Sequence, residues 1–379
     1  MNLRIISSAF FALVLTSLSW ASGISEEAKT SKEKSDARLK SAIMSQNIPL
    51  EKRVKALKEL YHDRTVNGRI HRHFCIWDPL GKLGPIASTV QDQTVRSVHY
   101  GLDASIAIFN NEQELIENFK KEKTCDAILV RGALAREFNK FAGTIEAIGA
   151  LPERKHLQLL MQVFTNPRLN RYMTDGEYTV MGFATIGGNY AFMRDKAYNS
   201  LSALEGKQVA VQTIEPPMTA LVNQYGGTPI EGGMMRNVLA YTDERVSSMI
   251  STAIAYLVMG SGQSGNSTGV LRNPLSQSTM QLIGRAEQFP DELAQLLRED
   301  FLLKFNNYAG RVDTEMNLVP DEFWIETPAD EKNKLEDATR EVRLTMRENG
   351  YYDGTMLRIA RKIRCRLNPE KAECVDPVE

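Results

Sequence analysis

The sequence is short of net charge, of cysteine and of long apolar runs. Its 46 Lys and Arg residues nearly balance 47 Asp and Glu residues, which gives a formal net charge of −1 at pH 7. A chain without a basic excess is poorly suited to coat nucleic acid or an anionic membrane, so we expect no nucleic-acid partner. Only 4 cysteines are present, too few for a small scaffold held together by disulfides. The 379 residues are instead enough for two domains with a large buried core.

The one long apolar run lies near the N-terminus and predicts export. Arg4 precedes an uncharged, mainly apolar stretch at 5–20, and small residues such as Ala21 and Gly23 follow. This three-part pattern is typical of a secretory signal peptide, which we place at 1–22 and expect to be cleaved. An uncleaved anchor is the alternative, but the run is short for a membrane span and contains several Ser and Thr residues. We therefore predict that the mature protein works outside the cytoplasm.

Export permits disulfides, and the four cysteines form two pairs of different character. Cys365 and Cys374 lie close together in sequence with Pro369 between them, which favours a local disulfide near the C-terminus. Cys75 and Cys125 lie in or at the start of separate predicted strands, so they can pair only if those strands are neighbours. Buried free thiols are the alternative for this second pair.

Alternating strand and helix patterns fill most of the chain and predict an α/β fold. A charged segment comes first, and apolar residues spaced as on a helix follow Pro49 within it. Apolar runs at 70–77, 104–109 and 125–130 then alternate with helical segments, which indicates mostly parallel strands covered by helices. A second unit of the same kind follows and returns to the first through a strand at 275–284.

These patterns divide the chain into five segments with two lobes at the centre. Strands at 178–183 and 191–193 are predicted as separate, and a strand at 208–212 belongs to the second lobe. The full division is a signal peptide at 1–22, a charged N-terminal extension with one helix at 23–68, a first lobe at 69–183 plus 270–310, a second lobe at 184–269 and a helical C-terminal region at 311–379.

The motifs of enzymes and metal sites are absent or lie in the wrong context. Residues 260–265 match G-x-G-x-x-G and residues 265–269 match G-x-S-x-G, but the surrounding Gly/Ser-rich loop lacks the strand and helix that these motifs need. No histidine follows His156, which excludes a hydrolase triad with histidine last. His71 and His73 share a strand face, yet the cysteine spacings are not those of a metal site. We therefore expect no enzyme activity, no metal and no cofactor.

Ligands of α/β folds bind at the C-terminal ends of parallel strands, and the sequence offers three such places. The Asp78–Gly84 loop follows the first strand, Arg131 follows the third, and Gln212 ends the strand of the second lobe. Glycines in the loop allow backbone amides to approach a ligand, and Arg131 is suited to an anionic one. The alternatives are a plain turn for the loop and a structural salt bridge for Arg131.

Three stretches of the sequence resemble a family of exported proteins. Residues 74–82 (FCIWDPLGK), 125–132 (CDAILVRG) and 136–152 (REFNKFAGTIEAIGALP) are similar to a group of Gram-negative periplasmic solute-binding proteins. That group is itself similar to the extracytoplasmic receptors of TRAP (tripartite ATP-independent periplasmic) transporters, and some members carry the AdeT-type name with an efflux label. The resemblance covers most of residues 70–375.

The resemblance implies a two-lobed α/β fold of the type II periplasmic-binding-protein kind, with mostly parallel sheets, hinge strands and a helical C-terminal region. It also implies closure on a small-molecule ligand by hinge motion, and a partner in the inner membrane, a TRAP-like or RND-type transporter. The sequence departs from the family at one point. Typical TRAP receptors grip a carboxylate with an arginine in a strand of the second lobe, but residues 207–212 contain no arginine.

We therefore predict a periplasmic solute-binding protein with nine residues at its ligand site. Arg131 and Arg136 are expected to balance negative charge on the ligand, and Tyr190 to stack on it or donate from its hydroxyl. Asp78 and Asn139 are expected to supply polar contacts. The full set is Asp78, Gly81, Lys82, Arg131, Arg136, Asn139, Tyr190, Gln212 and Asn273.

A second hypothesis places the chain in a different class. In it the chain is a non-enzymatic periplasmic accessory protein of an efflux (RND-type) or lipid-export complex, and it contacts that complex through the helical region at 329–363. An exposed apolar stripe along that region would favour this hypothesis over ligand binding.

Overall fold

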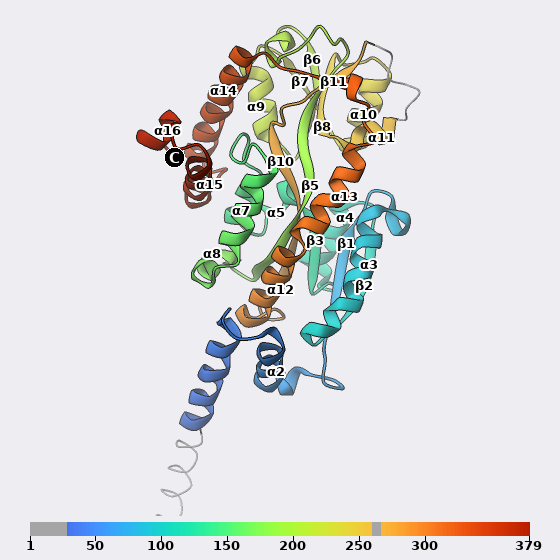
Figure 1. The fold of residues 1–379 in the computed structure, drawn as a ribbon. Helices are drawn as coiled ribbons and strands as arrows, with labels where there is room; N and C mark the ends of the chain where they lie inside the picture. The colour runs from blue at the N-terminus through green and yellow to red at the C-terminus, as the bar shows by residue number, and fades with distance from the viewer. Residues whose placement is uncertain (1–28, 260–266) are drawn as a thin grey trace, which may run out of the picture. The chain divides into compact units, whose positions relative to one another are not determined.

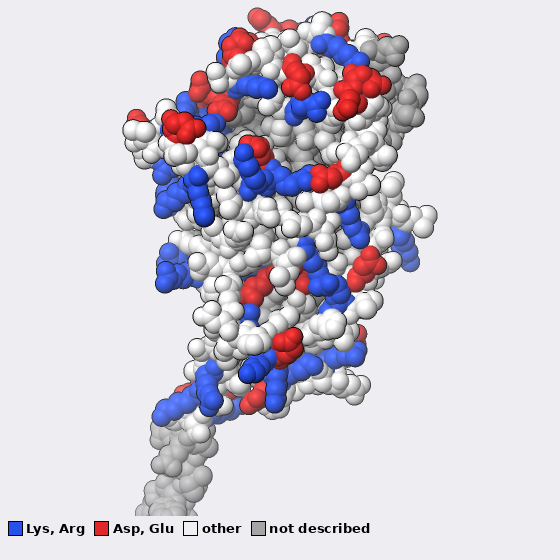
Figure 2. Space-filling view, in the orientation of Figure 1, with Lys and Arg blue, Asp and Glu red and all other residues white. Residues whose placement is uncertain are grey.

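The computed structural model describes residues 29–259 and 267–379. The predicted signal peptide at 1–22 and residues 260–266 of the Gly/Ser-rich loop lie outside these ranges. Over the described residues, no helix is both long enough and apolar enough to cross a membrane. Figure 2 shows basic and acidic side chains interspersed over much of the face that it draws, as the balanced composition leads one to expect.

The chain divides into two compact units: Met1–His71 with Val95–Asp103, and Arg72–Thr94 with Ala104–Glu379. In the first unit, helix α2 (Leu50–Leu60) begins directly after Pro49, as the sequence predicts, and buries Leu57 completely. Residues 29–44 form a further helix, so the prediction of one helix in this extension is incomplete. That helix was missed because it carries few apolar residues, of which Ile43 is fully buried.

The strands form one mixed sheet, and its path among the described residues runs β2-β1-β3-β10-β5-β8-β6-β7 (Figure 1). β4 pairs with β5, and β9 pairs with both β5 and β11 beside this path. The strands are β1 Ile70–Trp77, β2 Leu102–Phe109, β3 Ala127–Arg131, β4 Thr174–Asp175, β5 Tyr178–Met193, β6 Gln208–Gln212, β7 Thr228–Gly232, β8 Ser248–Thr252, β9 Gly269–Leu271, β10 Ser276–Arg285 and β11 Trp324–Ile325.

The predicted two-lobed α/β architecture is confirmed. β1 pairs in parallel with β3 in the first lobe, and β6 pairs in parallel with both β7 and β8 in the second lobe. β7 was not predicted because Pro229 lies within it. Proline is tolerated there since β7 is the edge strand at one end of the strand order.

Strands β5 and β10 join the two lobes. β10 pairs antiparallel with β3 over residues 280–284, while β5 pairs antiparallel with β8 over residues 189–193. β5 and β10 also pair with each other along their length, with a shift of register between Gln277 and Thr279 (Figure 1). The two strands are therefore shared between the lobes. The family resemblance implies hinge strands in this position.

The prediction of two separate strands at 178–183 and 191–193 is wrong, because β5 is continuous over Tyr178–Met193. The adjacent glycines Gly187 and Gly188 are a sequence pattern that usually weakens or interrupts a strand. Gly187 has a φ of +94°, a conformation that favours glycine, and it lets the strand bend without ending.

Helices cover the sheet, which is buried on both faces in the second lobe. Val209 and Val211 of β6 pack in one core with Leu221, whereas Ala210 packs in a different core with Val238. The longer helices are α3 Pro85–Ser97, α4 Glu112–Glu117, α7 Arg154–Phe164, α9 Pro216–Gln224, α10 Met234–Thr242, α11 Ile254–Met259, α12 Asp291–Leu303, α13 Phe305–Met316, α14 Ala329–Glu348 and α15 Gly354–Leu367. Shorter ones are α5 Gly132–Ala135, α6 Lys140–Gly143, α8 Asn170–Met173 and α16 Ala372–Val375.

The C-terminal helices are built into the lobes. Ala338 and Val342 of α14 lie in the same core as Leu221 of the second lobe. Arg364 of α15, itself buried, donates a hydrogen bond of 2.7 Å to the carbonyl oxygen of Ala150 in the first lobe. These apolar side chains of α14 are thus buried within the protein.

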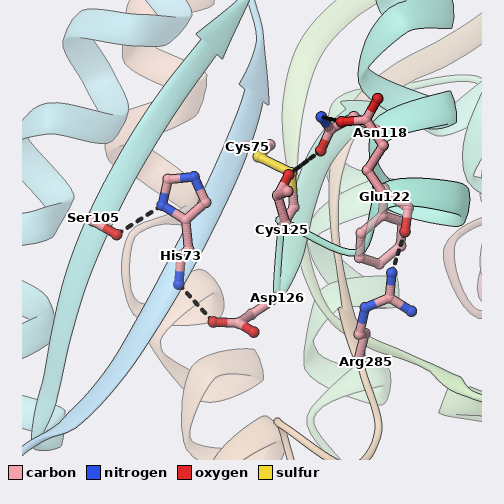
Figure 3. The surroundings of a disulfide bond; sticks show 10 residues. His73, Cys75, Ser105, Asn118, Glu122, Cys125, Asp126 and Arg285 are labelled. Atoms are coloured by element: carbon pink, nitrogen blue, oxygen red, sulfur yellow. Dashed lines mark hydrogen bonds between the residues drawn. A yellow bond between two sulfur atoms is a disulfide. The ribbon is translucent and has the colours of Figure 1, made fainter.

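Both disulfides that the sequence allows are present, and Figure 3 shows the surroundings of the Cys75–Cys125 bond. Cys75 lies in β1 and Cys125 lies just before β3, and these parallel neighbours bring the two Cα atoms to 5.8 Å. Cys365 and Cys374 join α15 to α16 across a sequence separation of 9. The parallel pairing of β1 with β3 decides between the disulfide and the free-thiol alternative for the first pair.

The two disulfides should differ in what they contribute to stability. The Cys75–Cys125 bond closes a loop of sequence separation 50 and the Cys365–Cys374 bond one of 9, so the loss of unfolded-state entropy predicts about 4 against about 2.5 kcal/mol. We expect a Cys75→Ala/Cys125→Ala variant to lose more unfolding free energy in urea than a Cys365→Ala/Cys374→Ala variant, which serves as its matched control. Equal losses, or the reverse order, would contradict this expectation.

Candidate functional site

The candidate site is built around Arg131, where β3 of the first lobe ends. Its guanidinium Nε donates to both carboxylate oxygens of Glu112, at 2.9 and 3.0 Å, and a second nitrogen donates to the same carboxylate. The guanidinium carbon lies 4.9 Å from the centre of the Trp77 ring. The remaining terminal nitrogen donates to Oε1 of Gln212, where β6 of the second lobe ends. One side chain therefore connects the strand ends of the two lobes.

Glu146 is the second charged group of the site and lies in a short helical turn after α6. Its carboxylate accepts hydrogen bonds from the backbone N–H and from the hydroxyl of Thr279 in β10, the latter at 2.7 Å. Burial raises the pKa of Glu146 to about 8, and the nearby charge of Glu215 adds to the rise, whereas the Thr279 bonds and Arg131 oppose it. The Glu146 carboxyl is therefore poised to exchange a proton near neutral pH.

A glycine makes room for this carboxylate. A Cβ atom on Gly132 would lie 2.2 Å from Oε1 of Glu146 and 2.4 Å from the hydroxyl oxygen of Thr279. Both distances are far inside van der Waals contact, so no other residue fits between β3 and the Glu146–Thr279 pair. Gly132 directly follows Arg131, and it thereby holds the two charged groups close to one another.

Glu215 is the third charged group and lies between β6 and α9. Its Oε1 accepts a hydrogen bond of 2.8 Å from the side-chain amide of Asn189 in β5. Burial raises the pKa of Glu215, while Arg131 and Asn189 oppose the rise. The residue as a whole is partly exposed, but its second carboxylate oxygen is buried. The site thus holds carboxylates from α4, from the turn after α6 and from the β6–α9 loop around a single arginine.

The C-terminal region supplies one further side chain. The ring of Tyr351, between α14 and α15, lies under the guanidinium of Arg136 at 3.9 Å. Burial raises the pKa of the Tyr351 hydroxyl, the Arg136 charge and hydrogen bond oppose this, and Glu215 and Glu146 add to the rise. Tyr351 is therefore within electrostatic reach of both carboxylates.

The structure brings Arg131 and Gln212 into contact, and these are two of the nine side chains predicted for the site. A third predicted residue, Arg136, lies over the ring of Tyr351, which is within electrostatic reach of Glu146 and Glu215. The salt-bridge alternative for Arg131 also holds, because its guanidinium pairs with Glu112. A direct ligand contact by any of the nine stays a prediction.

The side chain of Asp78 has a different set of partners. Its carboxylate accepts hydrogen bonds of 2.9 Å from the backbone N–H groups of Leu80, Ile86 and Ala87, and so it holds the loop against the start of α3. A Cβ atom on Gly84 would overlap this carboxylate, at 1.8 Å. The Asp78 carboxylate therefore organises the loop that we predicted as a ligand contact.

The other predicted residues lie in varied surroundings. Gly81 has a φ of +63° and forms the turn of the loop, and Lys82 beside it is exposed. Asn139 caps α6 by accepting from Ala142 and donates to a backbone carbonyl. Tyr190 packs edge-on against a tryptophan ring, with 5.5 Å between centres. The side-chain oxygen of Asn273 is buried and has no hydrogen-bond donor among the described residues.

Sequence reasoning missed the carboxylates around Arg131 and the Asn189 amide that donates to Glu215. Glu215 follows Gln212 by three residues, so its position in a loop after a β-strand was a usable signal. Glu146 lies within the stretch that carries the family resemblance, but only the fold shows that it faces Thr279. Tyr351 had no local signal at all, because its position depends on how the C-terminal helices pack.

The fold has several solved counterparts. A TRAP periplasmic solute-binding protein from Desulfovibrio salexigens, solved with bound orotic acid, superposes with a TM-score of 0.62 at 11% identity, covering 78% of this chain and 99% of that one. A counterpart from Ralstonia eutropha H16, solved with bound (S)-2-acetolactate, gives a TM-score of 0.60 at 10% identity, covering 78% and 99%. At this identity the likeness establishes the fold.

Sequence relatives establish the family. A protein of Acinetobacter baumannii named "Probable solute-binding protein AdeT1" is 27% identical over 303 residues, covering 79% of this chain and 98% of that protein. Its counterpart AdeT2 of the same organism is 21% identical over 233 residues, covering 61% and 98%. The family model "Solute-binding protein AdeT 1/2" matches residues 74–377, which is most of the chain. The chain therefore belongs to the AdeT 1/2 family of solute-binding proteins.

Proposed function

We propose that this protein binds a small ligand where the strand ends of its two lobes meet, and that it delivers the ligand to an inner-membrane transporter. The observation that carries the proposal is the hydrogen bond from Arg131 to Gln212, which joins the end of β3 to the end of β6. Ligands of open α/β sheets bind at such strand ends. The chain belongs to a family of solute-binding proteins, which supports a role in binding.

The proposed location is the periplasm. The leader pattern at 1–22 predicts export, and two disulfides fit an oxidising compartment. The solved counterparts from Desulfovibrio and Ralstonia are described as periplasmic. A ligand-loaded protein in that compartment would meet its transporter at the inner membrane, as TRAP-like receptors do.

Lobe closure is the proposed conformational step. β5 and β10 connect the lobes, and their register shifts between Gln277 and Thr279. An irregular ladder is easier to bend than a regular one, so a hinge there would move the two lobes as rigid bodies. In the arrangement described here, Arg131 of one lobe holds Gln212 of the other, and a ligand beside this bond would stabilise the closed form.

No observation favours the accessory-protein hypothesis. An exposed apolar stripe along residues 329–363 would have favoured that hypothesis. Ala338 and Val342 are buried in the core of the second lobe instead, and Leu357 and Ile363 are also buried.

Binding can be tested by thermal shift against a panel of small metabolites. We expect at least one compound to raise the Tm of the wild type by several degrees, because a ligand at 100 times its Kd adds about 2.7 kcal/mol. Arg131→Ala should abolish this response. Gln212→Ala should weaken it while leaving the Arg131–Glu112 pair intact, which separates loss of binding from loss of folding.

The matched control is Lys362→Ala on the exposed face of α15, which should respond like the wild type. If Arg131→Ala and Gln212→Ala both responded like the wild type, the ligand would have to bind at another place in the protein. A panel without any stabilising compound would count against solute binding itself.

The ionisation of Glu146 gives a second test, on stability. Its pKa is about 8 in the folded protein, against the ordinary value of 4.5 that we take for the unfolded chain. Between pH 4.5 and pH 8 the folded state therefore keeps a proton that the unfolded state has lost. The free energy of unfolding therefore falls as pH rises through this window, by at most about 1.4 kcal/mol per pH unit from this group.

Glu146→Gln keeps an acceptor for Thr279 and removes the ionisation. We expect the variant to gain stability relative to wild type as pH is raised from 5 to 8.5, measured by urea unfolding at both pH values. Glu370→Gln, on an exposed carboxylate, should show no such trend. A difference between Glu146→Gln and wild type that does not change with pH would show that Glu146 is ionised throughout.

A further inference from the structure

The groups around Glu215 lack hydrogen-bond donors. Its Oε2 is buried and receives no hydrogen bond from the described residues, and the same holds for the side-chain oxygen of Asn189. Asn189 is only 1% exposed, and its nitrogen donates to Glu215 at 2.8 Å and to the hydroxyl of Ser276 at 3.1 Å. With Glu215 ionised, turning the amide over would set its oxygen against the carboxylate, so the ionised form requires this orientation. Two adjacent buried acceptors thus stand unpaired.

The pattern repeats beside Glu146. Gln281 is fully buried, and its side-chain nitrogen donates to the carbonyl of Ala142 at 3.0 Å and to the hydroxyl of Thr279 at 3.2 Å. That hydroxyl donates onward to Glu146, while the side-chain oxygen of Gln281 has no donor in the described part of the chain. A buried polar group without a partner costs about 1–3 kcal/mol, so the two adjacent unpaired oxygens of Glu215 and Asn189 point to a missing partner.

The arginines do not supply the missing donors. The Arg131 guanidinium is engaged by Glu112 on one side and by Gln212 on the other, so its charge is already balanced by a bidentate carboxylate. Arg136 lies over the ring of Tyr351. Every unpaired group named above is an acceptor. A carboxylate ligand would therefore meet acceptors, and not donors, at the unpaired oxygens of Glu215 and Asn189.

We infer that the ligand is a small organic cation with N–H donors, a protonated amine or a guanidinium, held by Glu215 and the side-chain oxygen of Asn189. The inference rests on the proposed solute-binding function and specifies its ligand class. An ammonium or guanidinium group offers several donors and one positive charge, which matches two adjacent acceptors of which one is a carboxylate oxygen. The solved counterparts named above hold organic acids instead, and this chain also lacks an arginine in β6.

The pH dependence of binding separates a cation from an anion. The charged or titratable groups around the two carboxylates are Glu112, Arg131, Arg136, Glu146, Glu215 and Tyr351. Burial raises the pKa of both Glu215 and Glu146, so a bound cation favours their ionised forms and releases protons. The affinity for an amine should therefore rise between pH 6 and pH 8.5, whereas the affinity for a carboxylate should fall.

The test is a thermal-shift and calorimetric comparison of chosen probes on the mature wild-type chain. Agmatine, putrescine and ethanolamine carry N–H donors on a cation. Choline carries the same charge as ethanolamine with methyl groups in place of the N–H donors, while succinate and glucose represent anions and neutral solutes. We expect stabilisation by members of the first group, none by choline, and an affinity that rises at least tenfold from pH 6 to pH 8.5.

A matched pair of variants locates the site. Glu215→Gln preserves the shape of the side chain but removes its charge, and it should weaken amine binding at least tenfold. Glu370→Gln removes an exposed carboxylate and should bind as the wild type does. Equal affinity in the two variants would overturn the assignment to Glu215.

The remaining outcomes distinguish the inference that the ligand is a cation from the proposal that the protein binds a solute. Stabilisation by succinate or glucose and not by the amines would overturn the cation inference while leaving solute binding intact. Stabilisation by none of the probes, nor by any member of the wider metabolite panel, would overturn both and leave ordered water as the partner of the buried acceptors.

Discussion

The guanidinium of Arg131 is the interaction on which the arrangement of the site depends. It lies at the end of β3, pairs with Glu112 from α4, rests on the Trp77 ring and reaches Gln212 at the end of β6. A buried arginine in such a position needs several acceptors, because an unpaired buried charge is costly. The same contacts that satisfy it therefore also fix the distance between the strand ends of the two lobes.

The surroundings of that arginine define an unusual receptor. Family membership and fold describe a solute-binding protein, and the counterparts with this fold were solved with organic acids. In this chain the charge of Arg131 is paired with Glu112 inside the protein, and Glu215 lies beside the buried side-chain oxygen of Asn189. One scaffold can thus serve different ligands through the residues at a few strand ends, because fold and ligand preference are set by different side chains.

Much of the fold was predictable, because it depends on local patterns. The apolar run of β3 predicted a buried strand ending at Arg131, and the cysteine positions allowed the pairing that the parallel strands β1 and β3 then fix. Of the charged and polar residues described around the site, the sequence predicted Arg131 and Gln212, which end strands, and Arg136. Glu146 and Glu215 look like surface charge in a sequence, and their burial follows from the packing of β10, β5 and the C-terminal helices around them. Asp78 is the opposite case. It follows a strand and was predicted to contact the ligand, but its carboxylate accepts hydrogen bonds from backbone N–H groups at the start of α3.

The central claim is that a ligand binds beside Arg131 and donates hydrogen bonds to Glu215 and Asn189. The most direct measurement is a crystal structure of the mature protein purified with its natural ligand. The account predicts density for a bound molecule with a nitrogen within hydrogen-bond distance of Oε2 of Glu215 and the side-chain oxygen of Asn189. Density for a molecule bound elsewhere, or ordered water alone on these two oxygens, would contradict it.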